Sequence, residues 1–164
     1  MGKRRRIVCC IVVGLLVLWG LWYARPLDVS ALTGERDLYG FNGVVRCAEA
    51  RQDGRWGLDC RAFGFLAGEA EMDALNRQLE TLRFRRNPLE VVLRYLPREG
   101  ASLCGYAFDL YGFGQDGAPF PALRFDGEHW AHGDGLPLYA SGETEEAGAR
   151  LGEWLWAHGR EFDR

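Results

Sequence analysis

An unbroken run of apolar residues covers positions 7–24, directly after a basic N-terminus. A helix of these 18 residues, at about 1.5 Å per residue, spans about 27 Å, close to the thickness of a bilayer's hydrocarbon core. No charge interrupts the run, so its backbone can pair within the helix while its side chains face lipid. We therefore predict a basic tail over residues 1–6 and a transmembrane helix over residues 7–24.

The basic cluster Lys3–Arg6 predicts the orientation of this helix, because positively charged flanks stay in the cytoplasm. We expect a single-pass signal-anchor protein of the cell membrane. Its N-terminus would be cytoplasmic, and the chain beyond Arg25 would be extracytoplasmic. The main alternative is a cleaved signal peptide. Cleavage after Ala24 would place Trp22 where a small residue is required, and the apolar run is longer than a usual signal core. A retained anchor is the favoured interpretation.

Beyond the anchor, short runs that alternate between apolar and polar residues predict strands, and Asp-Gly pairs between them predict tight turns. The first hairpin joins residues 44–51 to residues 55–65 around Asp53-Gly54. Residues 69–86 carry an apolar stripe with helical spacing, acidic residues at the start and arginines at the end, which predicts a helix. The stripe consists of Met72, Leu75, Leu79 and Leu82.

The remaining pattern predicts more strands and a second helix over residues 144–159. Because turns rather than regularly alternating helices separate the strands, we expect an α+β domain over residues 41–164. It would have an antiparallel meander sheet with two helices packed on one face. Residues 25–40 are expected to be a linker or edge segment that connects the anchor to the domain. Within it, residues 27–32 would form either a short linker or an edge strand. The further strands are expected at residues 89–96, 103–113, 120–125, 128–132 and 136–140.

The part of the chain after the anchor is acidic. Beyond residue 25 there are 23 acidic and 15 basic side chains, a net charge of −8, and the whole chain is 48% hydrophobic. That composition is typical of a globular domain with its own core. A negatively charged domain is poorly suited to bind nucleic-acid phosphates or anionic headgroups. We therefore expect no nucleic-acid partner and contact with the bilayer only through residues 7–24.

The cysteines have different expected roles. Cys9 and Cys10 lie in the apolar run, where they are either ordinary apolar residues or acylated at the inner leaflet. A two-residue turn at Asp53-Gly54 would place Cys47 opposite Cys60 with alpha carbons about 4.5 Å apart, close enough for a disulfide. The alternative is a pair of reduced core cysteines. Cys104 is expected on the apolar face of its strand as a buried, inert thiol.

The polar segment 128–134 contains the best candidate for chemistry. His129, His132 and Asp134 offer donor atoms suited to a divalent metal. Residues three apart on a strand point to opposite faces, however, so the two histidines converge only if the strand ends between them.

The Asp126-Gly127 turn favours a structural alternative for the same segment. It would pair Leu123 with Trp130, which makes Trp130 a core residue and leaves His129 on the surface. No nucleophile motif, zinc motif or phosphate loop accompanies the segment. We therefore assign no catalytic residue, metal or cofactor.

Aromatic and arginine side chains are frequent anchors of protein interfaces, and two groups of them lie off the predicted core. The first is Trp156 on the second predicted helix, where it points away from Trp154. The second is a group of three arginines at the end of the first predicted helix: Arg83, Arg85 and Arg86. We expect these residues to form contact surfaces for an envelope protein or a small ligand.

An anchor followed by a small acidic α+β domain is similar to the plan of many bacterial envelope proteins, a likeness that implies no activity. The leading hypothesis is a non-enzymatic, membrane-anchored extracytoplasmic binding module. The alternative is an extracytoplasmic metal-assisted or acid/base hydrolase that uses His129, His132 and Asp134. A third hypothesis is a structural subunit of a larger membrane complex.

Overall fold

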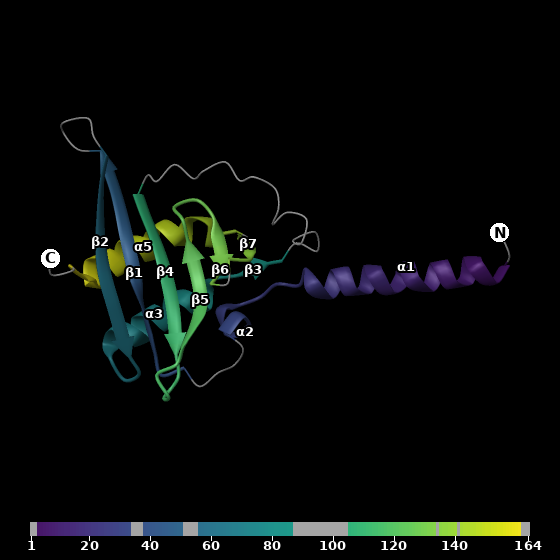
Figure 1. Ribbon diagram of the computed structural model, residues 1–164, viewed down its shortest axis with the longest axis horizontal. Coiled ribbons are helices and arrows are strands. Elements are labelled where there is room, and N and C mark those ends of the chain that lie inside the picture. Colours follow the sequence, from purple (N-terminus) through teal and green to yellow (C-terminus); the bar gives the residue numbers. More distant parts are fainter. Residues whose placement is uncertain are drawn as a thin grey trace.

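The computed structural model describes residues 3–33, 38–50, 56–86, 105–133, 135–140 and 142–161. It begins with a long helix, α1 (Lys3–Tyr23), which projects away from the rest of the chain (Figure 1). Within α1, residues 5–23 are long and apolar enough to cross a bilayer, and none of the most apolar stretch is buried against the domain. Length and composition alone do not distinguish such a helix from a signal sequence near the N-terminus.

Within the described ranges, eight strands form one sheet, which Figure 1 shows nearly face-on, in the order β3-β7-β6-β5-β4-β1-β2-β8. Each pair of neighbours is antiparallel, as predicted, and β4 to β7 follow one another as a meander. The strands are β1 (Gly40–Ala50), β2 (Trp56–Leu66), β3 (Phe84–Arg85), β4 (Gly105–Phe113), β5 (Pro119–Phe125), β6 (Trp130–His132), β7 (Pro137–Ala140) and β8 (Arg160–Glu161).

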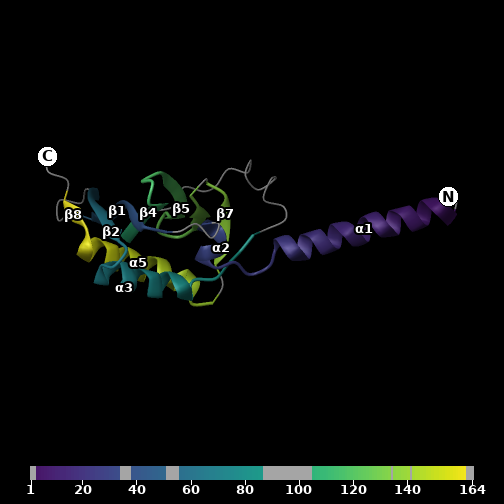
Figure 2. The ribbon, with the colours of Figure 1, turned by 90° about the horizontal axis from the view of Figure 1, so that it is seen from below.

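Two longer helices, α3 (Ala70–Thr81) and α5 (Thr144–His158), lie on the same side of this sheet (Figure 2). The strands turn apolar side chains toward them, because alternate residues of a strand share a face. Across β1, β4 and β5 these side chains are at most 2% exposed: Phe41, Val45, Phe108, Leu110 and Leu123. The core therefore lies between the sheet and its two helices, and no helix of the described residues lies on the opposite face, which we call the helix-free face.

Helix α3 presents the apolar face that its spacing predicts, and α5 also buries apolar residues against the sheet. In α3 the buried residues are Met72, Leu75 and Leu79, followed by Leu82 just beyond its end. In α5, Leu151 and Leu155 are buried, and two glycines let the helix lie close to the strands. A Cβ on Gly148 would collide with the Phe125 ring, and one on Gly152 would lie 2.5 Å from the Tyr106 Cβ.

The chain joins the domain at the β3 edge of the sheet. Leu27 and Phe84 each donate a backbone hydrogen bond to the other's carbonyl, both 2.8 Å long. A short helix, α2 (Val29–Thr33), follows and buries Val29 and Leu32 in the core. The edge strand predicted over residues 27–32 is therefore reduced to one bridge, because the apolar side chains that follow are buried by a helical turn.

The first predicted helix ends earlier than its charge pattern indicates. It stops at Thr81 rather than at residue 86, and Phe84 enters β3, where it pairs with Ala140 of β7 and is completely buried. Burial of this large ring and the two bonds to Leu27 outweigh the weak preference of arginines for a helix C-terminus. The second helix begins and ends within one residue of its prediction.

Most of the strands predicted in the second half of the chain are present. The strands predicted around residues 120–125, 128–132 and 136–140 are confirmed as β5, β6 and β7, with β6 beginning only at Trp130. The strand predicted at 103–113 is present from Gly105 onward. Residues 89–96, Cys104 and Asp134 lie outside the described residues.

Candidate functional site

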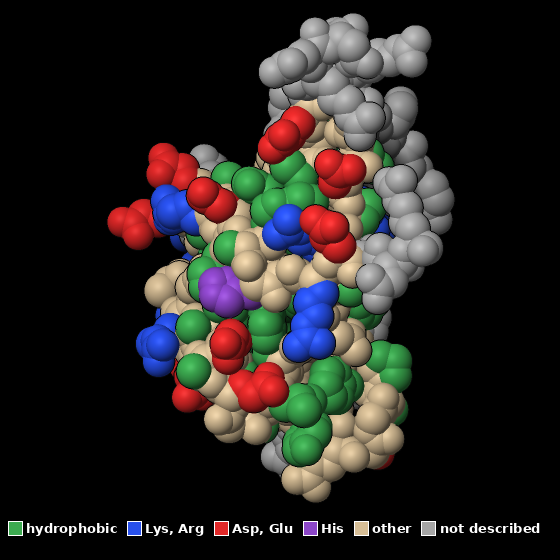
Figure 3. Space-filling model, turned by 90° about the vertical axis from the view of Figure 1, so that its left-hand side faces the viewer, with side chains coloured by type: hydrophobic (Ala, Val, Ile, Leu, Met, Phe, Trp, Pro, Cys, Tyr) green, Lys and Arg blue, Asp and Glu red, His purple; other side chains and the backbone are tan. Residues whose placement is uncertain are grey.

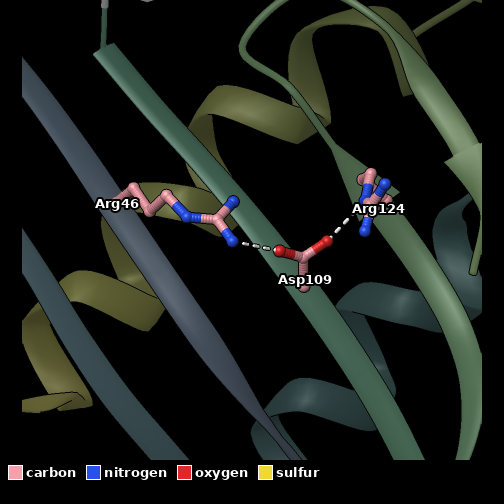
Figure 4. Close-up of polar contacts among 3 residues, drawn as sticks. All are labelled: Arg46, Asp109 and Arg124. Atoms are coloured by element: carbon pink, nitrogen blue, oxygen red, sulfur yellow. Dashed lines mark hydrogen bonds and ion pairs between the residues drawn. The ribbon is translucent and has the colours of Figure 1, made fainter.

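The face of the sheet without helices carries a cluster of three charged side chains from three adjacent strands. Asp109 of β4 lies between Arg46 of β1 and Arg124 of β5 (Figure 4). The Arg46 Nη2 donates to Asp109 Oδ2 and the Arg124 Nε donates to Asp109 Oδ1, each at 2.5 Å. We call these three residues the Arg-Asp-Arg cluster.

The strand register explains why these residues meet. Asp109 pairs with Arg124 directly across β4 and β5, and with Val44 across β4 and β1. Arg46 is two residues beyond Val44 and therefore points to the same face, from which its long side chain reaches back to the carboxylate. The apolar neighbours Phe108 and Leu110 point to the helices instead.

Burial differs strongly within the cluster. The Asp109 side chain is 8% exposed, whereas those of Arg46 and Arg124 are 39% and 49% exposed. A buried carboxylate needs compensating charge, and the guanidinium groups supply it through charge-assisted hydrogen bonds. The hydrogen bond and charge of Asp109 raise the pKa of Arg124, and Tyr111 adds to this effect. The cluster therefore holds two charged arginines over one carboxylate.

A cavity of about 530 Å³ opens between α2, α3 and the start of β1. Its wall combines apolar side chains, such as Phe41 and Leu79, with the polar residues Asp28 and Arg83. Asp28 accepts hydrogen bonds from the Ala31 backbone and the Ser30 hydroxyl, which lower its pKa. Arg83 donates to the carbonyls of Glu80 and Leu82. These two charged groups thus make local bonds that fix the helix ends.

The two histidines of the predicted metal site are held in different ways. His129 lies outside β6, its side chain is 59% exposed, and its Nδ1 is 3.6 Å from Asp126 Oδ1. His132 pairs with Leu123 in the sheet, and its Nε2 lies 3.2 Å from the Leu32 carbonyl of α2. Among the described residues there is no group of three or more His, Cys, Asp and Glu side chains that could hold a metal.

The predicted disulfide between Cys47 and Cys60 is wrong. Cys47 pairs with Asp59, and Cys60 pairs with Arg46, one residue away from the expected register. The two cysteines therefore point to opposite faces of the hairpin, and both are free. Cys47 is buried, and desolvation followed by its hydrogen bond to Glu49 raises the pKa of its thiol to about 11. It is therefore a protonated and weakly nucleophilic thiol at neutral pH.

The predicted contact residues lie at two different edges of the sheet. Arg85 belongs to β3, where the chain arrives from α1, and Arg83 and Arg86 flank this strand in the sequence. The Arg86 guanidinium lies 5.8 Å from the Tyr23 ring centroid. Trp156 lies near the other edge, where the Arg61 guanidinium of β2 sits 4.3 Å from its ring centroid.

Trp156 is half-buried and packs against the core, so only part of its ring is open to a partner. Figure 3 looks at the end of the domain farthest from α1, and there acidic, basic and hydrophobic side chains are interspersed. Because Trp156 and the arginines of the β3 region lie near opposite edges of the sheet, they would form two separate surfaces.

Sequence patterns did not identify the Arg-Asp-Arg cluster. The available signal was Asp109 itself, a carboxylate within the otherwise apolar stretch Tyr106–Tyr111 of a central strand. A buried carboxylate requires partners, but only the three-dimensional register identifies Arg46 and Arg124 among the arginines of the chain.

Comparisons of the chain with protein-family models, with curated proteins and with solved structures find no match.

Proposed function

We propose that the protein is a membrane-tethered extracytoplasmic binding module that meets its partner through the helix-free face of the sheet. The observation that carries the proposal is the Arg-Asp-Arg cluster on that face. It presents two partly exposed arginines whose positions are fixed by a buried carboxylate. Prearranged arginines of this kind are typical anchors of binding surfaces.

The tether is supported by the surface of α1. Its most apolar stretch contributes nothing to the core of the domain, and large side chains such as Leu15, Leu16 and Leu18 are more than 60% exposed. An isolated helix with such a surface is unfavourable in water and favourable in lipid. The basic residues before it favour a cytoplasmic N-terminus and hence an extracytoplasmic domain.

A topology experiment tests the tether. We expect the full chain, fused at its C-terminus to a reporter that is active only outside the cytoplasm, to be active and to remain in membranes after alkaline extraction. Its intact mass should include the first 25 residues. Replacing Leu15 and Leu16 with arginine should release the protein or block its insertion, because each arginine costs about 2.5–3.5 kcal/mol at the helix centre.

The control for this experiment is Leu58→Arg, since Leu58 is 53% exposed but belongs to the domain. It should leave membrane retention unchanged. A fully soluble native protein, a reporter active only inside the cell, or a mature mass without the first 25 residues would each contradict the anchored topology.

Photocrosslinking in cells tests the binding face. We expect a photoreactive amino acid at Asn42, an exposed position on the helix-free face, to give a discrete adduct with a second protein or ligand. The same amino acid at Ala149, exposed on α5, is the matched control and should give none. Adducts at position 149 alone, or equally at both positions, would reject this face as the binding surface.

The hydrolase alternative is not supported by the geometry of the described residues. His129 makes contacts within its own loop, while His132 is directed at the α2 backbone. A shared proton or ion would require both imidazoles to face one reacting group.

A further inference from the structure

We propose that Arg25, Arg85 and Arg86 bind the phosphate groups of anionic phospholipids in the leaflet from which α1 emerges. We call these three residues the juxtamembrane arginines. The inference rests on the tether of the proposed function and adds a lipid-binding surface to the partner-binding face. It departs from the expectation that only residues 7–24 contact the bilayer. Figure 1 shows β3, the edge strand that contains Arg85, on the side of the domain that faces α1.

The position of Arg86 next to α1 is the main observation. Its guanidinium lies 5.8 Å from the Tyr23 ring centroid, although the two residues are far apart in the chain. Tyr23 is the last residue of α1, and the Trp19 ring stacks on it with ring centroids 5.3 Å apart. Aromatic residues at the end of a membrane helix lie at the level of the lipid headgroups. The fold thus brings a positive charge of the domain to the depth of the lipid phosphates.

Arg25 has a similar position directly after the helix. Its guanidinium lies 5.1 Å from the Trp22 ring centroid, and the residue is exposed. Both distances are within the range of a cation–π interaction, which engages the face of a guanidinium and leaves N–H donors at its edge. Such donors match the geometry of phosphate oxygen atoms. Arg25 and Arg86 can therefore contact aromatic rings and lipid phosphates at the same time.

The charges of the juxtamembrane arginines are not neutralised within the described part of the protein. The ion pairs of arginines there belong to four other residues: Arg46, Arg61, Arg124 and Arg150. Arg85 is exposed on β3 and lies opposite Tyr139, a neutral residue that is 43% exposed. Uncompensated positive charges attract a lipid with a net negative charge more strongly than a lipid with none.

The negative charge of the whole domain does not oppose this contact. The chain beyond residue 25 has a net charge of −8. At physiological ionic strength, however, exposed charges more than about 8 Å apart are largely screened from each other. Asp28, the acid nearest to Arg25 in the sequence, accepts hydrogen bonds from the Ser30 hydroxyl and the Ala31 amide at the start of α2. Arginines next to the end of α1 therefore outweigh more distant acids.

The test uses the full chain in phosphatidylcholine nanodiscs that contain a small fraction of one spin-labelled lipid. The label occupies the same acyl position in phosphatidylglycerol or in phosphatidylcholine, and NMR measures the paramagnetic relaxation of backbone amides. We expect labelled phosphatidylglycerol to relax the amides of Arg85 and Tyr139 at least about twofold more, because each arginine near an anionic surface strengthens binding roughly fivefold. The amide of Glu161, at the opposite edge of the sheet, should show no difference.

Two triple variants test which charges carry this preference. Replacement of the three juxtamembrane arginines with glutamine (Arg25→Gln, Arg85→Gln and Arg86→Gln) should abolish it. The matched control replaces three arginines that are exposed elsewhere on the domain: Arg77→Gln, Arg150→Gln and Arg160→Gln. Both variants lose three positive charges, so they differ only in where the charges were. The control should keep the preference for phosphatidylglycerol.

Three outcomes would overturn the proposal: equal relaxation by the two lipids in the native protein, a preference that survives in the juxtamembrane variant, or an equal loss in both variants. Any of them would leave an acidic protein as the candidate partner of these arginines. The amide of Leu18 in α1 reports on the tether separately. If the labels relax Leu18 but the two lipids do not differ at Arg85, this inference fails and the tether remains supported. If neither label relaxes Leu18, both proposals fail.

Discussion

Replacing Trp130 with alanine should destabilise the domain by about 3–5 kcal/mol, the range for loss of a buried large aromatic side chain. Trp130 is 2% exposed, and its ring centroid lies 5.0–5.7 Å from those of Phe84, Phe108 and Phe125. These rings come from β3, β4 and β5, so one substitution would open a cavity that several strands share. A chain of this size should lose roughly 6–20 °C in melting temperature.

A hydrogen bond of the Trp130 indole adds to the expected loss of stability. Its Nε1 donates a 3.1 Å hydrogen bond to the carbonyl of Thr144, the first residue of α5, which is itself buried. Trp130→Phe should therefore cost less than Trp130→Ala, because it keeps most of the packing and loses only this hydrogen bond.

Unfolding of the full chain followed by far-ultraviolet circular dichroism measures these differences. His129→Ala is the neighbouring control, because the His129 side chain is 59% exposed, and its effect should stay within about 0.5 kcal/mol. A cost for Trp130→Ala as small as that of His129→Ala would show that the ring cluster does not stabilise the fold.

Removing both arginines of the Arg-Asp-Arg cluster should cost far more than the two single replacements together. In Arg46→Gln or Arg124→Gln alone, Asp109 keeps one guanidinium, and we expect a loss of about 1 kcal/mol. In the double variant a carboxylate that is 8% exposed has lost both partners, and breaking such a buried pair costs about 3–5 kcal/mol.

A thermodynamic cycle of the wild type, both single variants and the double variant measures this coupling. Adding Asp109→Asn to the double variant should restore much of the lost stability, because it removes the uncompensated charge. Additive single effects, or no recovery with Asp109→Asn, would contradict a shared carboxylate as the centre of the cluster.

Two turns illustrate which parts of the fold were predictable. The Asp126-Gly127 turn was expected to pair Leu123 with Trp130, but Trp130 pairs with Phe125, two residues further on. A shift of two residues keeps every side chain on its face, so the prediction of Trp130 as a core residue is confirmed.

At the first hairpin the shift is one residue, and the consequence is the opposite. Ala50 pairs with Trp56, which leaves five residues between the paired ends instead of the two expected around Asp53-Gly54. An odd shift reverses the faces of one strand relative to the other. This is why the predicted disulfide partners Cys47 and Cys60 do not face each other, and why Arg46 lies opposite Cys60.

Local patterns predicted the helices better than the contacts between distant strands. The apolar stripe of α3 and the extent of α5 depend on residues three or four apart, which a sequence displays directly. The burial of Phe84 depends on Leu27 and Ala140, each more than 50 residues away in the chain. The Arg-Asp-Arg cluster has the same dependence, since 63 residues separate Arg46 from Asp109.

The junction between Leu27 and Phe84 limits how far the domain can move from whatever holds α1. Only Ala24, Arg25 and Pro26 lie between the end of α1 at Tyr23 and the bonded Leu27. Fully extended, the chain from Tyr23 to Leu27 reaches about 14 Å. A bilayer around α1 would thus keep the β3 edge of the sheet near its surface, and a partner would have to be recruited within that narrow zone rather than captured at a distance.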